Sequence, residues 1–211
     1  MPFYGAETTG NAHLSRLMLL NRNKDPRMRL LPTVIALLVA PALALAQATP
    51  PANATTTPQA PATHGGSFRS PDGADRGTLT LTAAPDGVLL RIDVKGLTPG
   101  WHALHFHEKG ACADEKFASA GGHVHGANPV IHGLLSVGHN DAGDLPNVYV
   151  AADGSGAAEV YSNLITAQLR DKRPAIFDAD GTAVVIHAMA DDYISQPIGN
   201  AGPRVACAVI R

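Results

Sequence analysis

The sequence predicts an all-β domain built as an antiparallel sandwich or barrel, and three observations lead to this prediction. Short runs that alternate polar and apolar residues, or that are rich in β-branched residues, recur along the chain. Turn residues separate these runs at intervals of about 8–12 residues, and the 21 glycines and 16 prolines supply them. No run carries a convincing helical periodicity.

Each predicted strand has its own local pattern. Residues 77–82 alternate threonine with apolar leucine, as a half-buried strand does, and Pro85-Asp86-Gly87 supplies the turn into the return strand. Residues 153–156 join a second hairpin in the same way. The predicted strands are residues 77–82, 88–94, 101–107, 148–151, 157–161, 183–188 and 205–210. The segments 111–146 and 189–203 between them are long, glycine-rich loops with polar side chains.

The N-terminal segment predicts export. A short basic stretch at 27–29 precedes an apolar run over 30–43, and Ala44-Leu45-Ala46 matches an A-x-A cleavage site. The apolar run is shorter than the ~20 residues of a membrane span, so we expect no transmembrane span in the mature chain. We interpret residues 1–46 as an over-extended start followed by a signal peptide over about 28–46. An exported, periplasmic protein is therefore expected.

The mature chain is predicted to hold a linker and one folded domain. Residues 47–64 are rich in Pro, Ala and Thr and cannot bury enough apolar surface to fold, so we expect a flexible linker there and a domain over 65–211. Past Ala46 the chain has 16 acidic and 11 basic residues, a net charge of −5. Because no basic stripe appears, we expect no nucleic-acid partner.

Export also affects what is expected of the two cysteines. In an oxidising compartment Cys112 and Cys207 should pair, whereas in the cytosol they would be free thiols. A disulfide closing so long a loop would contribute roughly 4–5 kcal/mol to stability in the chain-entropy account.

Histidines are concentrated in one third of the chain, where three fall within seven residues and five more follow over 123–187. Side chains two apart on a strand share a face, so His105 and His107 can reach one metal ion while His102 points the other way. A lone histidine is usually an ordinary surface or core residue. A His-x-His pair on a strand, followed by spaced histidines and aspartates, instead predicts a metal site.

Five ordered motifs resemble copper/zinc superoxide dismutase, over about residues 75–211. They are His105-Phe106-His107-Glu108, Ser119-Ala120-Gly121-Gly122-His123, Gly143-Asp144-Leu145-Pro146, residues 187–192 and residues 199–207. The resemblance implies a Greek-key β-sandwich or barrel with long metal-binding loops. It also implies an enzyme that converts superoxide to dioxygen and hydrogen peroxide, with copper and zinc as cofactors.

The resemblance assigns the copper side of the site to four histidines. His105, His107, His123 and His187 match the copper ligands, and imidazole nitrogens suit a copper ion that changes valence. His123 matches the histidine that bridges copper and zinc, and as a catalytic residue it would carry a proton. Arg204 matches the catalytic arginine that attracts and orients the superoxide anion.

On the zinc side, His132 and Asp144 match ligands that act beside the bridging His123. Histidine nitrogen and carboxylate oxygen are both ordinary zinc ligands. Asp191 matches a carboxylate that links a copper histidine to a zinc histidine and so orients both rings.

The remaining zinc ligand departs from the family pattern. The family has a histidine three residues before the zinc aspartate, and here Asp141 stands at that position. His139 lies two residues away and offers the better zinc donor. Register favours Asp141 and chemistry favours His139, so the sequence leaves both alternatives open.

Two functions of different classes fit these residues. One is an exported superoxide dismutase acting on superoxide; the other is a non-catalytic copper/zinc-binding exported domain. Arg204 favours the enzyme, because a storage site has no use for an anion guide. A zinc hydrolase is disfavoured, since four histidines on one metal leave no open position for water. A homodimer is a further possibility.

Overall fold

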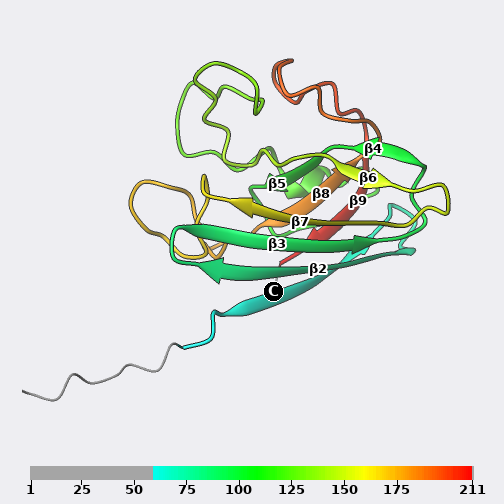
Figure 1. Cartoon of the computed structure of the whole chain (residues 1–211), viewed down its shortest axis with the longest axis horizontal. Coiled ribbons are helices and arrows are strands. Elements are labelled where there is room, and N and C mark those ends of the chain that lie inside the picture. Colours follow the sequence, from blue (N-terminus) through cyan, green and yellow to red (C-terminus); the bar gives the residue numbers. More distant parts are fainter. Residues whose placement is uncertain (1–58, 211) are drawn as a thin grey trace, which may run out of the picture. The chain divides into compact units, whose positions relative to one another are not determined.

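All nine strands in this computed structural model pair antiparallel, which confirms the predicted all-β class (Figure 1). The structure describes residues 59–210. The strands are β1 (Thr63–Arg69), β2 (Asp75–Ala84), β3 (Gly87–Val94), β4 (Gly100–His102), β5 (Leu104–His107), β6 (Val148–Val150), β7 (Gly156–Ser162), β8 (Ala183–His187) and β9 (Arg204–Val209).

Helical structure among residues 59–210 is confined to η1, a 3-10 turn at Ala118–Ala120. This part of the chain contains no helix of the length and apolar character needed to cross a membrane. The predicted over-extended start and signal peptide, and the predicted linker up to residue 58, lie outside the described residues.

The strands form a seven-stranded sheet in the order β5-β8-β9-β1-β2-β3-β7 and a two-stranded sheet of β4 and β6. β4 continues into β5 across Ala103, and β6 leads into β7 through the turn at 151–155. The small sheet therefore joins the two edge strands of the large one. As a result the strands curl around one interior, with β2, β3 and β7 on the near side of Figure 1 and β5, β8 and β9 behind them.

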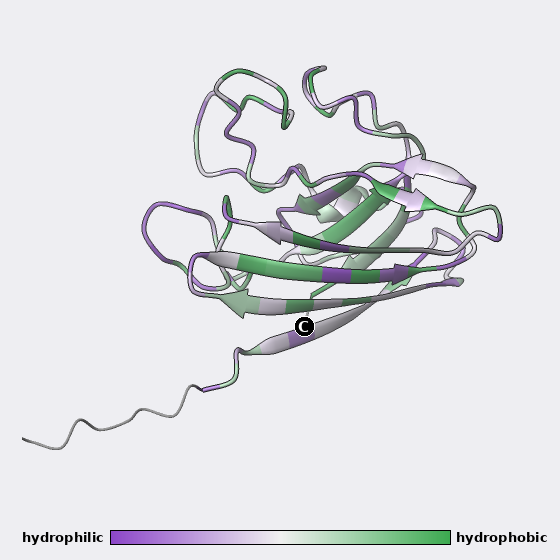
Figure 2. Cartoon of the chain, viewed as in Figure 1, coloured by the Kyte–Doolittle hydropathy of each residue, from purple (hydrophilic) through white to green (hydrophobic). Residues whose placement is uncertain are grey.

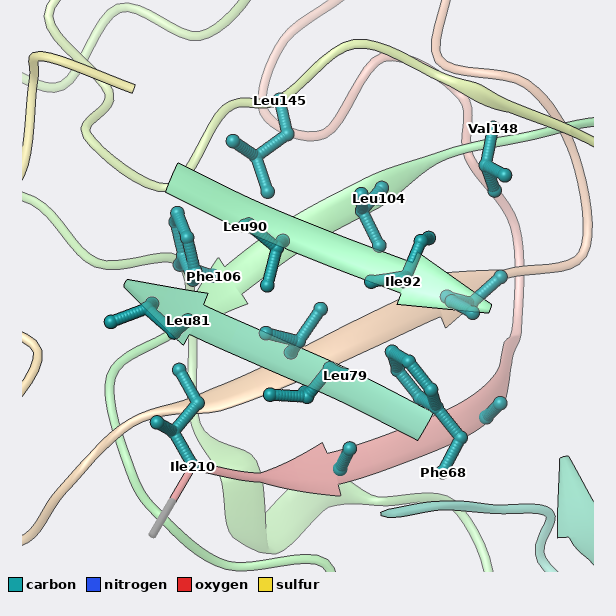
Figure 3. Packing of buried hydrophobic residues seen from close by; sticks show 14 of the residues in the cluster. Phe68, Leu79, Leu81, Leu90, Ile92, Leu104, Phe106, Leu145, Val148 and Ile210 are labelled. Carbon is teal, nitrogen blue, oxygen red and sulfur yellow. The ribbon is translucent and has the colours of Figure 1, made fainter. Parts of the chain in front are cut away.

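Alternation along the strands fills this interior with aliphatic side chains. In the β2–β3 hairpin Leu79 pairs with Ile92 and Leu81 with Leu90, and all four are almost fully buried. Thr78 and Thr80, which alternate with these leucines, face outward and are exposed. Figure 3 shows these side chains meeting those of the opposite strands, and Figure 2 shows the hydrophobic character of β3. Each such burial stabilises the fold by about 1.5–3 kcal/mol.

The predicted histidine-rich strand is two strands that share no partner. β4 pairs with β6, and β5 pairs with β8. Along β5, Leu104 and Phe106 belong to the hydrophobic core, so the alternate residues His105 and His107 face the other side. All four are buried, because one face of β5 meets the core and the other is covered by loops.

The predicted start of the domain is wrong by two residues. Thr63 and His64, assigned to the linker by composition, already belong to β1 and pair with Thr82 and Leu81 of β2. Local sequence does not reveal this strand, because most of its residues are glycine or polar. Its pairing to β2 creates the strand, and Phe68 anchors it in the core.

Cys112 and Cys207 form a disulfide, as predicted, with Cα atoms 5.9 Å apart and a sequence separation of 95. It fastens the long loop after β5 to β9. The two long loops predicted on either side of residues 147–187 are present, and both stand at the same end of the barrel (Figure 1).

Candidate metal centre

Two neighbouring strands and a loop bring four of the predicted histidines together. His105 and His107 come from β5, His187 ends the adjacent strand β8, and His123 follows η1. All four are buried, and each offers a ligand nitrogen to one group in which these atoms lie within 4.8 Å of one another.

Backbone carbonyls fix the tautomers of two of these rings. His107 Nδ1 donates to Gly121 O at 3.0 Å, and His187 Nδ1 donates to Gly202 O at 2.9 Å. The opposite nitrogens then carry lone pairs that face the cluster. Buried atoms without a hydrogen-bond partner include His105 Nδ1, His107 Nε2, His123 Nε2 and His187 Nε2. Burying such atoms unpaired costs about 1–3 kcal/mol each, and a cation bound by all four would remove that cost.

The protonation of these rings also suits a metal. Burial, together with the neighbouring His123, lowers the pKa of His107 to about 2. Burial and the neighbouring His105 lower the pKa of His187 to about 3. Both imidazoles are therefore neutral at physiological pH, which is the state that binds metal ions.

A second group of potential metal ligands, His105, His123, His132 and Asp144, shares two histidines with the first, and Asp141 lies against it. His123 Nδ1 lies 2.9 Å from Asp141 Oδ2 and 3.5 Å from Asp144 Oδ1. His132 Nδ1 lies 3.6 Å from Asp141 Oδ2 and 2.6 Å from Asp144 Oδ1. His132 Nδ1 and Asp144 Oδ1 nevertheless lack a hydrogen-bond partner, because their orientation makes no bond between them. Two nitrogens and two carboxylate oxygens thus converge on one point.

The carboxylates of this second cluster attract positive charge. Burial opposes the charged form of His132, but the adjacent carboxylates of Asp141, Asp144 and Asp191 outweigh it and raise the pKa of His132 to about 11. Burial likewise opposes the charged form of His123, and the bonds to Asp141 and Asp144 raise its pKa above the ordinary value. Carboxylates that hold protons on two imidazoles in this way would also favour a divalent cation in the same place.

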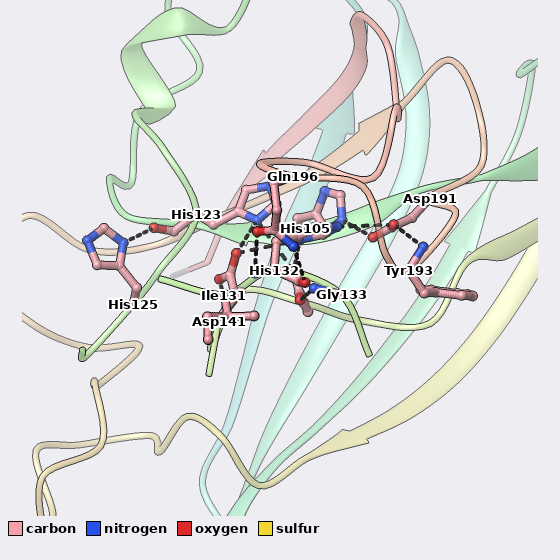
Figure 4. Close-up of polar contacts among 12 residues, drawn as sticks. His105, His123, His125, Ile131, His132, Gly133, Asp141, Asp191, Tyr193 and Gln196 are labelled. Atoms are coloured by element: carbon pink, nitrogen blue, oxygen red, sulfur yellow. Dashed lines mark hydrogen bonds and ion pairs between the residues drawn. The ribbon is translucent and has the colours of Figure 1, made fainter. Parts of the chain in front are cut away.

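Asp191 joins the two clusters (Figure 4). Its Oδ2 accepts from His105 Nε2 at 2.9 Å, and its Oδ1 accepts from His132 Nε2 at 3.1 Å. Tyr193 N also donates to Oδ1, at 2.6 Å. One carboxylate therefore orients a ring of each cluster, with those rings' other nitrogens left facing inward.

A cavity of about 760 Å³ opens over the first cluster and is lined by His107, His123, His187 and Arg204. The Arg204 guanidinium donates to Phe117 O at 2.5 Å and to Gly121 O at 2.6 Å. These two carbonyls fix its position beside the histidines. A held cation next to neutral imidazoles makes a binding place for a small anion.

Residues 75–210 match the family described as copper/zinc superoxide dismutase. The chain belongs to this family.

Individual family members agree with the match. The chain is 57% identical over 140 residues to a Cu-Zn superoxide dismutase of Caulobacter vibrioides, covering 66% of this chain and 80% of that protein. It is 42% identical over 138 residues to Cu-Zn superoxide dismutase 2 of Aquifex aeolicus, covering 64% of this chain and 78% of that protein.

Solved structures of the family share the fold. A superoxide dismutase-like protein from Bacillus subtilis superposes with a TM-score of 0.65 at 33% identity, covering 69% of this chain and 97% of that one. The Cu/Zn superoxide dismutase from Brucella abortus gives a TM-score of 0.57 at 27% identity, covering 71% of this chain and all of that one. Copper and zinc are the cofactors of the family, and the two clusters offer the donors that these ions prefer.

The remaining histidines near the family's site lie outside the clusters. His102 is buried, with Nδ1 2.7 Å from His187 O and Nε2 2.8 Å from Thr98 O. Both ring nitrogens are therefore used in contacts with the backbone, as in a structural histidine. His125 is exposed and donates from Nδ1 to His123 O at 2.9 Å. His139 is partly exposed and belongs to neither cluster.

The sequence analysis overlooked three side chains around this site. Lys116 lines the cavity beside Arg204. Asn147 holds the backbone of Asp191 at both its N–H and its C=O, each at 2.9 Å. Gln196 holds the backbone of His132 in a similar way. Asn147 directly follows one of the family motifs, but nothing in the sequence marks Lys116 or Gln196.

Proposed function

We propose that this family member is an exported enzyme that converts superoxide to dioxygen and hydrogen peroxide at a copper ion, with zinc beside it. One observation carries the proposal. The buried side-chain atoms that lack a hydrogen-bond partner among the described residues all belong to the two adjoining clusters: His105 Nδ1, His107 Nε2, His123 Nε2, His132 Nδ1, His187 Nε2 and Asp144 Oδ1. Folding leaves such atoms unpaired only where another partner binds them.

We assign copper to His105, His107, His123 and His187. Four imidazole nitrogens are a donor set that copper accepts in both of its valences. The other nitrogens of His105, His107 and His187 are held by Asp191, Gly121 O and Gly202 O, so these three rings keep their orientation throughout the reaction.

For zinc we propose His123, His132, Asp144 and Asp141, and not His139. Donor atoms placed tetrahedrally about 2.0 Å from zinc lie about 3.3 Å from one another. The four nitrogen–oxygen distances in the cluster, from 2.6 to 3.6 Å, are centred near this spacing. The set thus contains two carboxylates where the family pattern has one.

Bound copper would supply the alternating one-electron reduction and oxidation that dismutation needs. His123 Nε2 would hold a proton in one half of the cycle and deliver it to the forming hydrogen peroxide in the other, and water in the open cavity would supply the second proton. Arg204, fixed by Phe117 O and Gly121 O, would bind and orient the superoxide anion in the cavity. Because the mature chain has a net charge of −5, attraction of the anion must be local to this cavity.

The disulfide supports the proposed export, since disulfides persist in oxidising compartments such as the periplasm.

For the assembly we propose a homodimer through the outer face of β4 and β6. There Trp101 and Tyr149 pair across the strands with ring centroids 5.0 Å apart, and each is more than half exposed. Exposed aromatic pairs of this kind are enriched at protein interfaces.

Metal content and superoxide dismutation of the purified mature protein test the function together. We expect one copper and one zinc per chain and rapid superoxide decay that is lost when copper is removed. Full copper loading without dismutation would contradict the enzyme and favour a copper/zinc-binding domain.

A further inference from the structure

The side chain of Gln196 occupies both backbone hydrogen-bonding groups of His132 (Figure 4). His132 N donates to Gln196 Oε1 at 2.9 Å, and Gln196 Nε2 donates to His132 O at 2.8 Å. One side-chain amide thus makes the two backbone hydrogen bonds that a neighbouring strand would make to a residue in a sheet. Gln196 is itself exposed, so the contact is made by hydrogen bonds and not by core packing.

The same loop also holds the ring of His132 and the residues after it. Asp191 Oδ1 accepts from His132 Nε2 at 3.1 Å, and Tyr193 O accepts from Leu135 N at 3.2 Å. Gly133 has a φ of +102°, and a Cβ there would lie 2.1 Å from Tyr193 O. Residues 191–196 are therefore fitted closely along residues 132–135.

Beyond Gln196 this loop becomes a wall of the cavity over the copper-side histidines. Ile198, Gly202 and Pro203 line that cavity, directly before Arg204. The loop is braced internally, since Gly199 N donates to Ser195 O at 2.7 Å and Asp192 N donates to Gly199 O at 3.0 Å. A displacement of the backbone at Gln196 would therefore also displace residues 198–203, which form the cavity wall.

We propose that Gln196 is a positioning residue that couples zinc binding at His132 to the order of the cavity wall, residues 198–203. This inference rests on the zinc assignment proposed above. With its backbone held by Gln196 and its ring by Asp191, His132 keeps Nδ1 aimed at the zinc position. Bound zinc in turn holds His132, and through the amide it holds the loop that forms the wall.

Gln196→Met tests this coupling, because methionine keeps the length of the side chain and removes both hydrogen bonds. Gln196→Ala provides a second variant. The matched control is Gln168→Met, which changes an exposed glutamine with no side-chain hydrogen bond in the structure, on the loop between β7 and β8. The copper-loaded proteins would be titrated with zinc against a chelator, and amide hydrogen exchange of residue 132 and residues 198–203 would be measured with and without zinc.

For wild type and Gln168→Met we expect zinc to slow exchange over 198–203. For both Gln196 variants we expect zinc affinity to fall by about tenfold or more, with fast exchange at the His132 amide and little zinc-dependent protection of 198–203. Equal affinity and equal protection in the Gln196 and Gln168 variants would overturn the coupling and leave the zinc assignment intact. Failure of the wild type to bind zinc would overturn both.

Discussion

Asp141 and His139 are two positions apart, yet only Asp141 reaches the zinc-side histidines. Its Oδ2 lies 2.9 Å from His123 Nδ1, and its Oδ1 accepts from Gly143 N at 3.0 Å, which fixes the carboxylate. His139 is partly exposed and belongs to neither group of potential metal ligands. A carboxylate in place of an imidazole also makes the site more negative, which favours retention of a divalent cation.

We therefore predict that Asp141→Ala loses zinc and His139→Ala keeps it. Removing a ligand should weaken binding by more than the roughly 10–100-fold that loss of an outer hydrogen-bonding partner costs. Zinc bound per chain after dialysis against a weak chelator measures the difference. Equal zinc retention in the two variants would show that neither residue is the ligand.

Lys116 is a further residue to test, because it lines the same cavity as Arg204, next in sequence to the acid Glu115 on the same wall. A positive charge at the cavity raises the local concentration of an anionic substrate, and salt screens this effect. We predict that Lys116→Gln lowers kcat/KM for superoxide several-fold at low ionic strength, with a smaller loss at high ionic strength. Lys172→Gln, on the loop between β7 and β8, is the control and should leave the rate unchanged. A Lys116→Gln variant with the wild-type rate and salt dependence would refute the steering role.

At the scale of single elements, β5 performs two tasks on its two faces. Leu104 and Phe106 complete the hydrophobic core, and His105 and His107 supply one edge of the copper-side cluster. The alternation of a strand makes this possible within four residues. The cluster therefore rests partly on two paired strands of the large sheet, while His123, His132 and the aspartates come from loops.

The loop after β5 depends on the disulfide, which ties Cys112 to Cys207 of β9. Phe117 and Gly121, whose carbonyls hold Arg204, lie in this loop. We predict that replacing both cysteines by serine lowers the free energy of unfolding by roughly 2–5 kcal/mol, with a loss of dismutation rate at full copper loading. Urea denaturation and a superoxide assay measure the two effects. An unchanged rate in the loaded variant would show that the core and β9 alone position Arg204.

At the scale of the whole molecule, the outer face of β4 and β6 is the proposed contact between two copies. Trp101 is 58% exposed and Tyr149 is 53% exposed. We predict that Trp101→Glu shifts a dimer to monomer, because it places a charge in an interface that would otherwise be apolar. Sedimentation velocity measures the change, and Tyr161→Glu on the exposed face of β7 is a control with a similarly exposed aromatic residue. A wild-type monomer at high protein concentration would contradict the proposal.

By itself, the sequence determined the all-β class, most strands, the disulfide partners and the clustered histidines. Strand alternation, turn residues and the His-x-His spacing are local signals, because each can be recognised within a few neighbouring residues. It did not show β1, whose glycine-rich residues become a strand only by pairing with β2. Nor did it separate Asp141 from His139, because the path of a loop depends on what packs against it. Only the tertiary structure brought Lys116 and Gln196 to the site, since contacts between distant loops leave no periodic pattern in the chain.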